Sequence, residues 1–271
     1  MQSLVWNFAA GLLVGLPLAA LAYRARALDA NAALLSVIFA CAYMLPGPVV
    51  FAAALTFFAS SSVVTRLGYA RKEKLGAAES RRGRSAAQVV GAGGAAALLC
   101  LLAVVTPHGH STSFTLAAVA ALAASNADTW AAEVGSLSRR KPKLILNPRL
   151  PIEPGTSGGV TLLGEVASAA GSALVALVVL ALSQLLGIGI TAQQVALIAL
   201  LGWAGELLDS IVGALLQAKY FCETCKVYTD KPVHKCGSKT AFTSGLKFVT
   251  NEVTNIISTC TVAAAAVLIF S

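Results

Sequence analysis

Ser125–Gly164 reads SNADTWAAEVGSLSRRKPKLILNPRLPIEPGTSGGVTLLG and joins two apolar segments of helical length. An apolar helix carries Asp128 and Glu133, breaks into a basic loop, and the loop ends in a glycine-rich turn before a second apolar segment. Ionisable residues inside a membrane helix are costly and by default mark a functional site. Acids within an apolar segment, with cations just outside it, indicate metal and phosphate chemistry at a membrane surface.

The composition is that of a polytopic membrane protein. Hydrophobic residues make up 57% of the 271 residues and charged residues only 12%, whereas a soluble domain has about 25% charged residues. Apolar segments of helical length recur from end to end, and Pro46-Gly47-Pro48 divides one long stretch into a helical hairpin. We therefore expect an all-α transmembrane bundle, a single domain over residues 1–271. The eight expected helices are Leu4–Ala22, Ala32–Leu45, Val49–Thr65, Ala86–Thr106, Phe114–Gly135, Gly158–Ser183, Ala192–Gln217 and Asn251–Phe270.

The cations define a topology. All 20 Lys and Arg residues lie in the links between helices 1 and 2, 3 and 4, 5 and 6, and 7 and 8, while the other links and both termini have none. The positive-inside rule places these four loops in the cytoplasm and both termini on the non-cytoplasmic side. Topology and contact with anionic lipids explain the net charge of +8, so we expect membrane lipids as partners and no nucleic acid.

Carboxylates gather at the predicted cytoplasmic ends of the helices. Glu206 and Asp209 are three residues apart and share a helix face, whereas Asp128 and Glu133 are five apart, about 140° round the helix. Hard oxygen ligands suit Mg²⁺, which takes one or two carboxylates plus substrate phosphates. We assign Mg²⁺ to Asp128 and Asp209, with Glu133 and Glu206 as further ligands or supporting groups. The simpler interpretation of each acid is an interfacial or ion-paired residue.

Two amides at the start of the last helix belong with these acids. Asn251 and Asn255 are four residues apart and therefore share a face. We expect them to complete the floor of the site, and the alternative roles are a helix N-cap and an inter-helix hydrogen bond.

The segment Pro154–Gly159, which we call the glycine turn, is the expected phosphate cradle. Its glycines free the backbone N–H groups, and a helix start at Gly158 would add its dipole. The turn is not a P-loop, because the GxxxxGK[ST] lysine is missing. The alternative is that these residues form a simple turn that caps the helix and binds no phosphate. The expected phosphate-binding residues are Gly155, Thr156, Ser157, Gly158 and Gly159.

The loop between helices 3 and 4 is rich in cations, and a solvated positive-inside loop is the simpler interpretation of each of them. As a set they suit a polyphosphate, and the expected nucleotide-binding residues here are Lys72, Lys74, Arg81, Arg84 and Gln88.

Residues 218–250 form a polar loop with a Cys/His cluster. A CxxC at Cys222 and Cys225 is followed by an HxC at His234 and Cys236, which gives four potential Zn²⁺ ligands. Disulfides are disfavoured in the cytoplasm, and a full set of four ligands leaves no open position, so we expect a structural Zn²⁺. A redox thiol pair and free thiols are the alternatives.

The combined motifs resemble the integral membrane proteins that include phytyl-phosphate kinase and the transmembrane-protein-19-like proteins. The resemblance runs from about Ser60 to Ile257 and rests on the opening stretch together with KLGAAESRRGRSAAQVVGAGG, GELLDSIVGALLQAKYFCETC, HKCG and TNEVTNIIS. It implies phosphorylation of an isoprenoid monophosphate, with CTP as donor and Mg²⁺ required. TNEVTN departs from the pattern, because Glu252 stands where the family has an aspartate.

The residues and the resemblance together predict an enzyme that transfers a phosphoryl group from CTP, or another nucleotide, to an isoprenoid monophosphate such as phytyl phosphate. Positioning and charge stabilisation dominate phosphoryl transfer, which fits a site of metal ligands and cations. A cytidylyltransferase would use the same site and release pyrophosphate. The alternatives that are not enzymes are a lipid or ion transporter and a zinc-stabilised scaffold.

Overall fold

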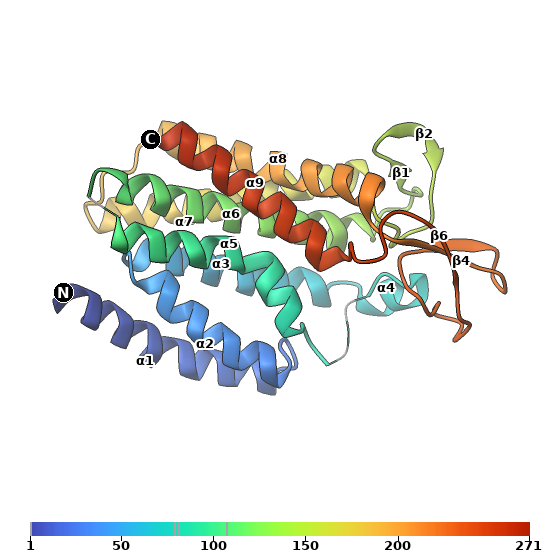
Figure 1. Cartoon of the computed structure of the whole chain (residues 1–271), viewed down its shortest axis with the longest axis horizontal. Helices are drawn as coiled ribbons and strands as arrows, with labels where there is room; N and C mark the ends of the chain where they lie inside the picture. The colour runs from blue at the N-terminus through green and yellow to red at the C-terminus, as the bar shows by residue number, and fades with distance from the viewer. Residues whose placement is uncertain (1, 79, 81, 107) are drawn as a thin grey trace.

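The computed structural model describes residues 2–78, 80, 82–106 and 108–271, and this part of the chain forms nine α-helices and two small β-sheets (Figure 1). The helices are α1 Gln2–Arg24, α2 Ala30–Met44, α3 Pro48–Arg66, α4 Tyr69–Leu75, α5 Ala86–Val105, α6 His108–Gly135, α7 Leu162–Leu185, α8 Ala192–Leu216 and α9 Asn251–Phe270.

The eight predicted helices are confirmed, and the short α4 is an addition to them. The hairpin break is also confirmed, because α2 ends at Met44, Gly47 has φ +118° and Pro48 begins α3. Two helix starts are wrong: α6 begins at His108 rather than Phe114, and α7 begins at Leu162 rather than Gly158, with Thr161 as N-cap, because Gly159–Val160 forms a strand instead of the first helical turn. Within the described residues, α1, α3, α5, α7, α8 and α9 are long and apolar enough to cross a membrane.

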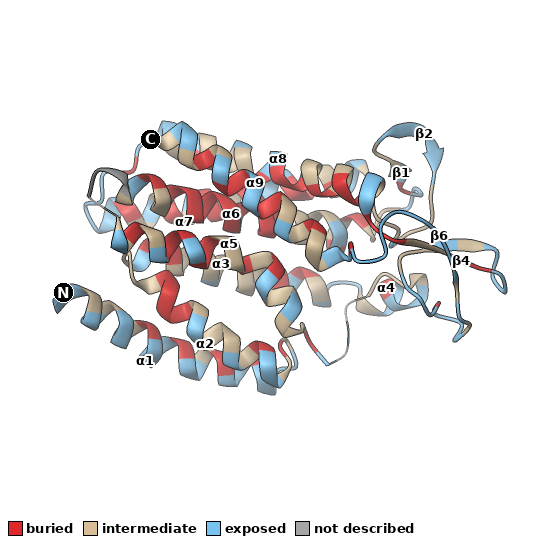
Figure 2. Cartoon of the chain, viewed as in Figure 1, coloured by how far each residue is buried: buried red, intermediate tan, exposed pale blue. Residues whose placement is uncertain are grey.

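Helix α6 is the centre of the bundle and packs against α3, α5, α7, α8 and α9. Every residue from Leu116 to Ala124 is buried (Figure 2), and most of them are alanines. Small side chains let helix backbones approach closely, which is the usual basis of packing inside a membrane. The polar residues near the C-terminal end of α6 are therefore surrounded by other helices.

Helices α1 and α2 pack against each other on one side of this bundle. A Cβ atom on Gly11 would lie 2.8 Å from the Cα of Cys41, and one on Gly15 would lie 2.7 Å from the Cβ of Ala40, so glycine permits this contact. Leu13 and Leu34, which are 77% and 69% exposed, face outward as expected for helices in contact with lipid.

One end of the bundle carries α4 and both sheets, and we call it the loop end; both chain termini lie at the opposite end (Figure 1). The first sheet has the antiparallel order β2-β1-β3, and the second has the antiparallel order β5-β4-β6. The strands are β1 Lys143–Leu144, β2 Asn147–Pro151, β3 Gly159–Val160, β4 Lys219–Cys222, β5 Val227–Thr229 and β6 Ala241–Ser244.

Candidate functional site

A cavity of about 190 Å³ opens between α6, α7, α8 and the glycine turn near the loop end. We call it the acidic cavity, because carboxylates line it and, among the described residues, no Lys or Arg does. Asn251 and the residues of the glycine turn also line it, so the structure brings together most of the predicted site. The lining carboxylates are Asp128, Glu165, Glu206, Asp209 and Asp230.

Helix α8 supplies two of these acids from one face, as their spacing predicts. Glu206 is 2% exposed and accepts hydrogen bonds from the hydroxyls of Ser168 (3.4 Å) and Ser210 (3.1 Å). Asp209 is 8% exposed and accepts one from Ser258 (3.2 Å). Neutral hydroxyls orient both carboxylates and leave their charges for another partner.

The two asparagines of α9 reach the same place. Asn251 lines the acidic cavity. In the side-chain orientation that gives both the amide oxygen and the amide nitrogen suitable partners, the nitrogen of Asn255 donates to Oδ1 of Asp209 (3.0 Å) and to the backbone carbonyl of Asn251 (3.2 Å). Asn255 therefore positions Asp209 and does not itself line the cavity.

Asp128 faces the α8 acids from α6. Its carboxylate interacts electrostatically with Glu206 and Asp209, and the guanidinium of Arg84 lies near enough to attract it. The acids do not converge as a tight cluster: among the described residues, the one group of three or more Asp, Glu, His or Cys side chains placed closely enough to hold a metal ion is the Cys/His cluster. The cavity therefore offers one or two direct carboxylate ligands to a cation, with the others acting at longer range.

Asn126, two residues before Asp128, ties the helices together. It is fully buried, its side-chain oxygen accepts from the hydroxyls of Ser60 and Ser61 (both 3.0 Å), and its Nδ2 donates to the carbonyl of Gly171 (2.7 Å). These bonds join α6 to α3 and α7, and they fix the rotation of α6 that turns Asp128 toward the cavity.

Glu133 does not line the acidic cavity. Its carboxylate pairs with the ammonium of Lys72 at 2.5 Å, and Lys72 also donates to the carbonyls of Val64 and Thr65 (both 2.8 Å). Lys72 is fully buried, and all three of its N–H groups are used within the protein. The pair fastens α4 to the ends of α3 and α6, so the structure does not present Lys72 to a phosphate.

The glycine turn is a wall of the acidic cavity rather than the start of a helix. The N–H groups of Thr156 and Gly159 donate to the carbonyls of Glu153 and Thr156 (both 3.2 Å), and that of Ser157 donates to Asp230 (2.7 Å). The expected cradle of free N–H groups is therefore largely absent in this part of the described chain. Gly158 has φ +77°, and a Cβ on it would lie 2.5 Å from the Cβ of Ala214 on α8.

Asp230 and Lys219, which sequence reasoning missed, hold this turn in place. Lys219 donates to the hydroxyl (2.7 Å) and carbonyl (3.1 Å) of Ser157. Burial raises the pKa of Asp230 while Lys219 opposes the shift, and burial lowers the pKa of Lys219 while Asp230 opposes it. Asp230 lies 73 residues from Ser157 in an ordinary polar loop, so no local signal could have found it.

A larger cavity of about 540 Å³, the loop-end cavity, adjoins the acidic cavity and shares Pro154, Gly155 and Thr156 with it. It lies between α4, the glycine turn and the second sheet. Unlike the acidic cavity it includes cations, Lys231 and Lys235, both of which are exposed.

The predicted cations of residues 72–88 are not brought into one clamp. Lys74 is exposed on α4, Arg84 lies over the ring of Phe57 (5.9 Å), and Gln88 completes a capping box with Ser85. Arg81 lies outside the described residues.

The four predicted zinc ligands converge. The ligand atoms of Cys222, Cys225, His234 and Cys236 all lie within 4.8 Å of one another. Hydrogen bonds from Ser238 and His234 lower the pKa of Cys236 to about 5, which makes it a thiolate, the form that binds metals. The β4–β5 hairpin carries the CxxC, and the following loop carries the HxC.

The chain belongs to the family described as integral membrane protein DUF92, whose model matches residues 13–263. It is 29% identical to Protein PGR of Arabidopsis thaliana over 261 residues, covering 87% of this chain and 86% of that protein. It is 33% identical to a Synechocystis protein described as an uncharacterized membrane protein, over 61% of this chain and 62% of the relative. No solved structure shows a significant match.

Proposed function

We propose that this member of the integral membrane protein DUF92 family transfers a phosphoryl group from CTP to an isoprenoid monophosphate at the cytoplasmic face of a membrane. The acidic cavity supports this proposal, because Asp128 on α6 and the Glu206–Asp209 pair on α8 line it together, beside the glycine turn. Phosphoryl transfer needs such a charged, positioning site more than it needs a nucleophile on the protein, because the substrate phosphate is itself the nucleophile.

The lining of the acidic cavity fits Mg²⁺. Several carboxylates without a lining cation repel one another, and Oδ1 of Asp230 is buried without a hydrogen bond in the described structure. Bound Mg²⁺ would neutralise the developing charge on the transferred phosphoryl group. Asp128 and Asp209 are the residues that would hold it, with Glu206 and Glu165 adding negative charge and Asn255 orienting Asp209.

The loop-end cavity is the place for the nucleotide. It is the larger of the two adjoining cavities, it meets the acidic cavity at Gly155 and Thr156, and it supplies Lys231 and Lys235 for a polyphosphate. A nucleotide bound there would extend its terminal phosphate past the glycine turn toward Asp128 and Asp209.

We further propose a structural Zn²⁺ at Cys222, Cys225, His234 and Cys236. A ligand set of thiolates and one imidazole within 4.8 Å suits tetrahedral Zn²⁺. Because Cys225 and His234 also line the loop-end cavity, this metal would fix the wall of the proposed nucleotide site.

The test is an assay of the purified protein with labelled CTP, ATP or GTP, Mg²⁺ and a panel of prenyl monophosphates, in which both products are identified. The proposal predicts CDP and the prenyl diphosphate. Release of pyrophosphate with retention of CMP on the lipid would instead identify a cytidylyltransferase. If no nucleotide is consumed with any lipid, the proposal is wrong.

A second candidate is cation transport, which the absence of lining Lys or Arg among the described residues of the acidic cavity favours. Against it, the packed segment Leu116–Ala124 of α6 continues from the cavity without a polar residue. Cation flux into liposomes without nucleotide consumption would support transport over phosphoryl transfer.

A further inference from the structure

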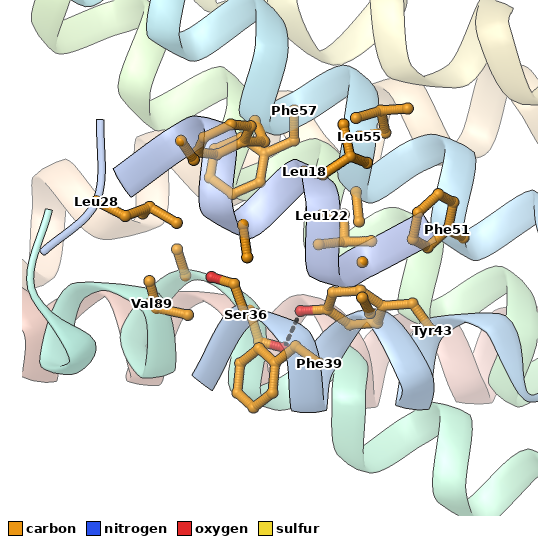
Figure 3. Close-up of a pocket in the computed structure, with 18 of the residues that line it drawn as sticks. Leu18, Leu28, Ser36, Phe39, Tyr43, Phe51, Leu55, Phe57, Val89 and Leu122 are labelled. Carbon is orange, nitrogen blue, oxygen red and sulfur yellow. Dashed lines mark hydrogen bonds between the residues drawn. The ribbon is translucent and has the colours of Figure 1, made fainter. Parts of the chain in front are cut away.

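A third cavity lies on the other side of the bundle, between α1, α2, α3 and α5. Figure 3 shows Leu18, Leu28, Phe57, Val89 and Tyr43 around it. Along α2 it extends from Ser36 to Tyr43, about 10 Å at 1.5 Å per residue. We call it the apolar cavity.

Few polar side chains line the apolar cavity, and one of them, Tyr43, already has a hydrogen-bond partner within the protein. The hydroxyl of Tyr43 donates to the carbonyl of Gly93 (2.9 Å), so it presents its ring to the cavity without an unsatisfied donor (Figure 3). A cavity walled by aliphatic and aromatic groups favours a hydrocarbon over water.

The charge is confined to the loop end of this cavity. Arg84 and Gln88 line it there, and Arg84 also lines a neighbouring cavity of about 330 Å³ that contains Arg26 and Arg66. An apolar cavity with Arg84 at one end, and with Arg26 and Arg66 in the cavity next to it, is complementary to a molecule with one hydrocarbon chain and an anionic head. Arginine in particular suits a phosphate, which its planar fork of donors can engage through two bonds.

We propose that the apolar cavity holds the hydrocarbon chain of the lipid monophosphate substrate, whose phosphate lies at Arg84. This inference rests on the proposed function and adds where the lipid binds. The guanidinium of Arg84 donates to the hydroxyl of Thr65 on α3 (3.4 Å) and interacts electrostatically with Asp128, so a phosphate at Arg84 would lie on the side of the bundle that faces the acidic cavity. The lipid and the nucleotide would then approach Asp128 from opposite sides.

The experiment maps the site without requiring turnover. The purified full chain is incubated with a long-chain prenyl monophosphate that carries a diazirine on its chain, without nucleotide, and the crosslinked peptides are identified by mass spectrometry. We expect crosslinks in α1, α2, α3 and α5. Crosslinks confined to α7, α8 and α9 would overturn the proposal, and so would equal competition by diacyl phosphatidic acid, because the site would then accept any anionic phospholipid.

A pair of variants on α3 sharpens the test. Ala54 lines the apolar cavity, whereas Ala59 is exposed on the same helix outside it. Ala54→Phe should raise the apparent Kd for the long-chain probe about tenfold, the cost of excluding roughly two methylene groups. Ala59→Phe should leave it within about twofold, a shift too small to reflect lost chain burial. Equal binding by both variants would overturn the proposal, and if Ala54→Phe does not fold, the wild-type crosslink map decides.

The turnover assay separates this inference from the proposed function. Crosslinks in the apolar cavity from a protein that consumes no nucleotide would support the chain site and refute the kinase. Turnover together with crosslinks elsewhere would support the kinase and refute the chain site.

Discussion

Asp128 and Glu133 show that the position of an acid on a helix determines which partners its side chain can reach. They are five residues apart on α6, and they have different partners: Asp128 lines the acidic cavity, and Glu133 pairs with Lys72. Helical geometry alone predicts that the two side chains diverge by about 140°. Which acid faces the cavity depends on the neighbouring helices, and the sequence around α6 does not contain that information.

The first prediction concerns the acids of the proposed metal site. Asp128→Asn keeps the shape of the side chain and removes its charge, so we expect turnover to fall at least about a hundredfold with folding intact. The measurement is turnover of CTP with a prenyl monophosphate, together with thermal unfolding in detergent.

Glu252→Gln is the matched control, because this acid lies at the start of α9 and does not line the acidic cavity. We expect it to retain most of the activity. Near-normal activity of folded Asp128→Asn would remove Asp128 from the site.

The second prediction concerns the buried pair of Lys72 and Glu133. Lys72→Met leaves a buried carboxylate without its cation, so we expect the free energy of unfolding to fall by about 3–5 kcal/mol. Replacing both partners, as Lys72→Met with Glu133→Leu, should recover part of the loss. Lys141→Met breaks an exposed pair with Glu153 and should cost no more than about 1 kcal/mol. Equal losses of unfolding free energy in Lys72→Met and Lys141→Met would contradict a stabilising buried ion pair between Lys72 and Glu133.

At the scale of the elements, long apolar segments were predictable and short polar ones were not. Eight helices follow from their length and hydropathy, because the bilayer imposes both. The two-residue strands β1 and β3 depend on pairing with each other, and no pattern in two residues can signal that. This is why the glycine turn was predicted to open α7 at Gly158, whereas the chain first adds β3.

The third prediction tests how the glycine turn contacts α8. Gly158 and Gly187 both have positive φ, so alanine at either costs about 1–2 kcal/mol of backbone strain. Gly158→Ala also brings a Cβ against Ala214, whereas a Cβ on Gly187 would have nothing within 4 Å. We expect Gly158→Ala to lower both thermal stability and turnover, and Gly187→Ala to lower stability slightly with turnover unchanged. Equal turnover by Gly158→Ala and Gly187→Ala would show that the contact between the glycine turn and α8 is not needed for activity.

The fourth prediction concerns the Cys/His cluster on the second sheet. The protein should purify with one equivalent of zinc, measured by plasma mass spectrometry, and a chelator should lower the unfolding temperature. Cys222→Ser should lower zinc content and stability together, because Cys222 is fully buried among the other ligands. Cys260→Ser, on the exposed face of α9, should change neither. A protein that contains no zinc and is not stabilised by added Zn²⁺ would exclude the metal.

At the scale of the whole molecule, the proposed site depends on three separate cavities, of which, among the described residues, only the acidic cavity is lined by the loop end of α6. The apolar, acidic and loop-end cavities are each formed by several elements that are far apart in the sequence, and Asp230 meets Ser157 from 73 residues away. Sequence patterns identified most of the acids because charge is costly inside a membrane. They could not identify the cavities, since a cavity is a property of how separate elements pack.

The fifth prediction follows from the distribution of charge over the whole chain. Every Lys and Arg that the structure describes lies in a link at the loop end or in a helix segment next to one, and both termini lie at the other end. The positive-inside rule then predicts a cytoplasmic loop end and termini on the non-cytoplasmic side. Alkaline phosphatase, which is active only outside the cytoplasm, should be active when fused after Ser271 and inactive when inserted after Gly237, an exposed turn at the loop end. The opposite pattern would place the acidic cavity away from cytoplasmic nucleotides, and the proposed kinase activity would fail with it.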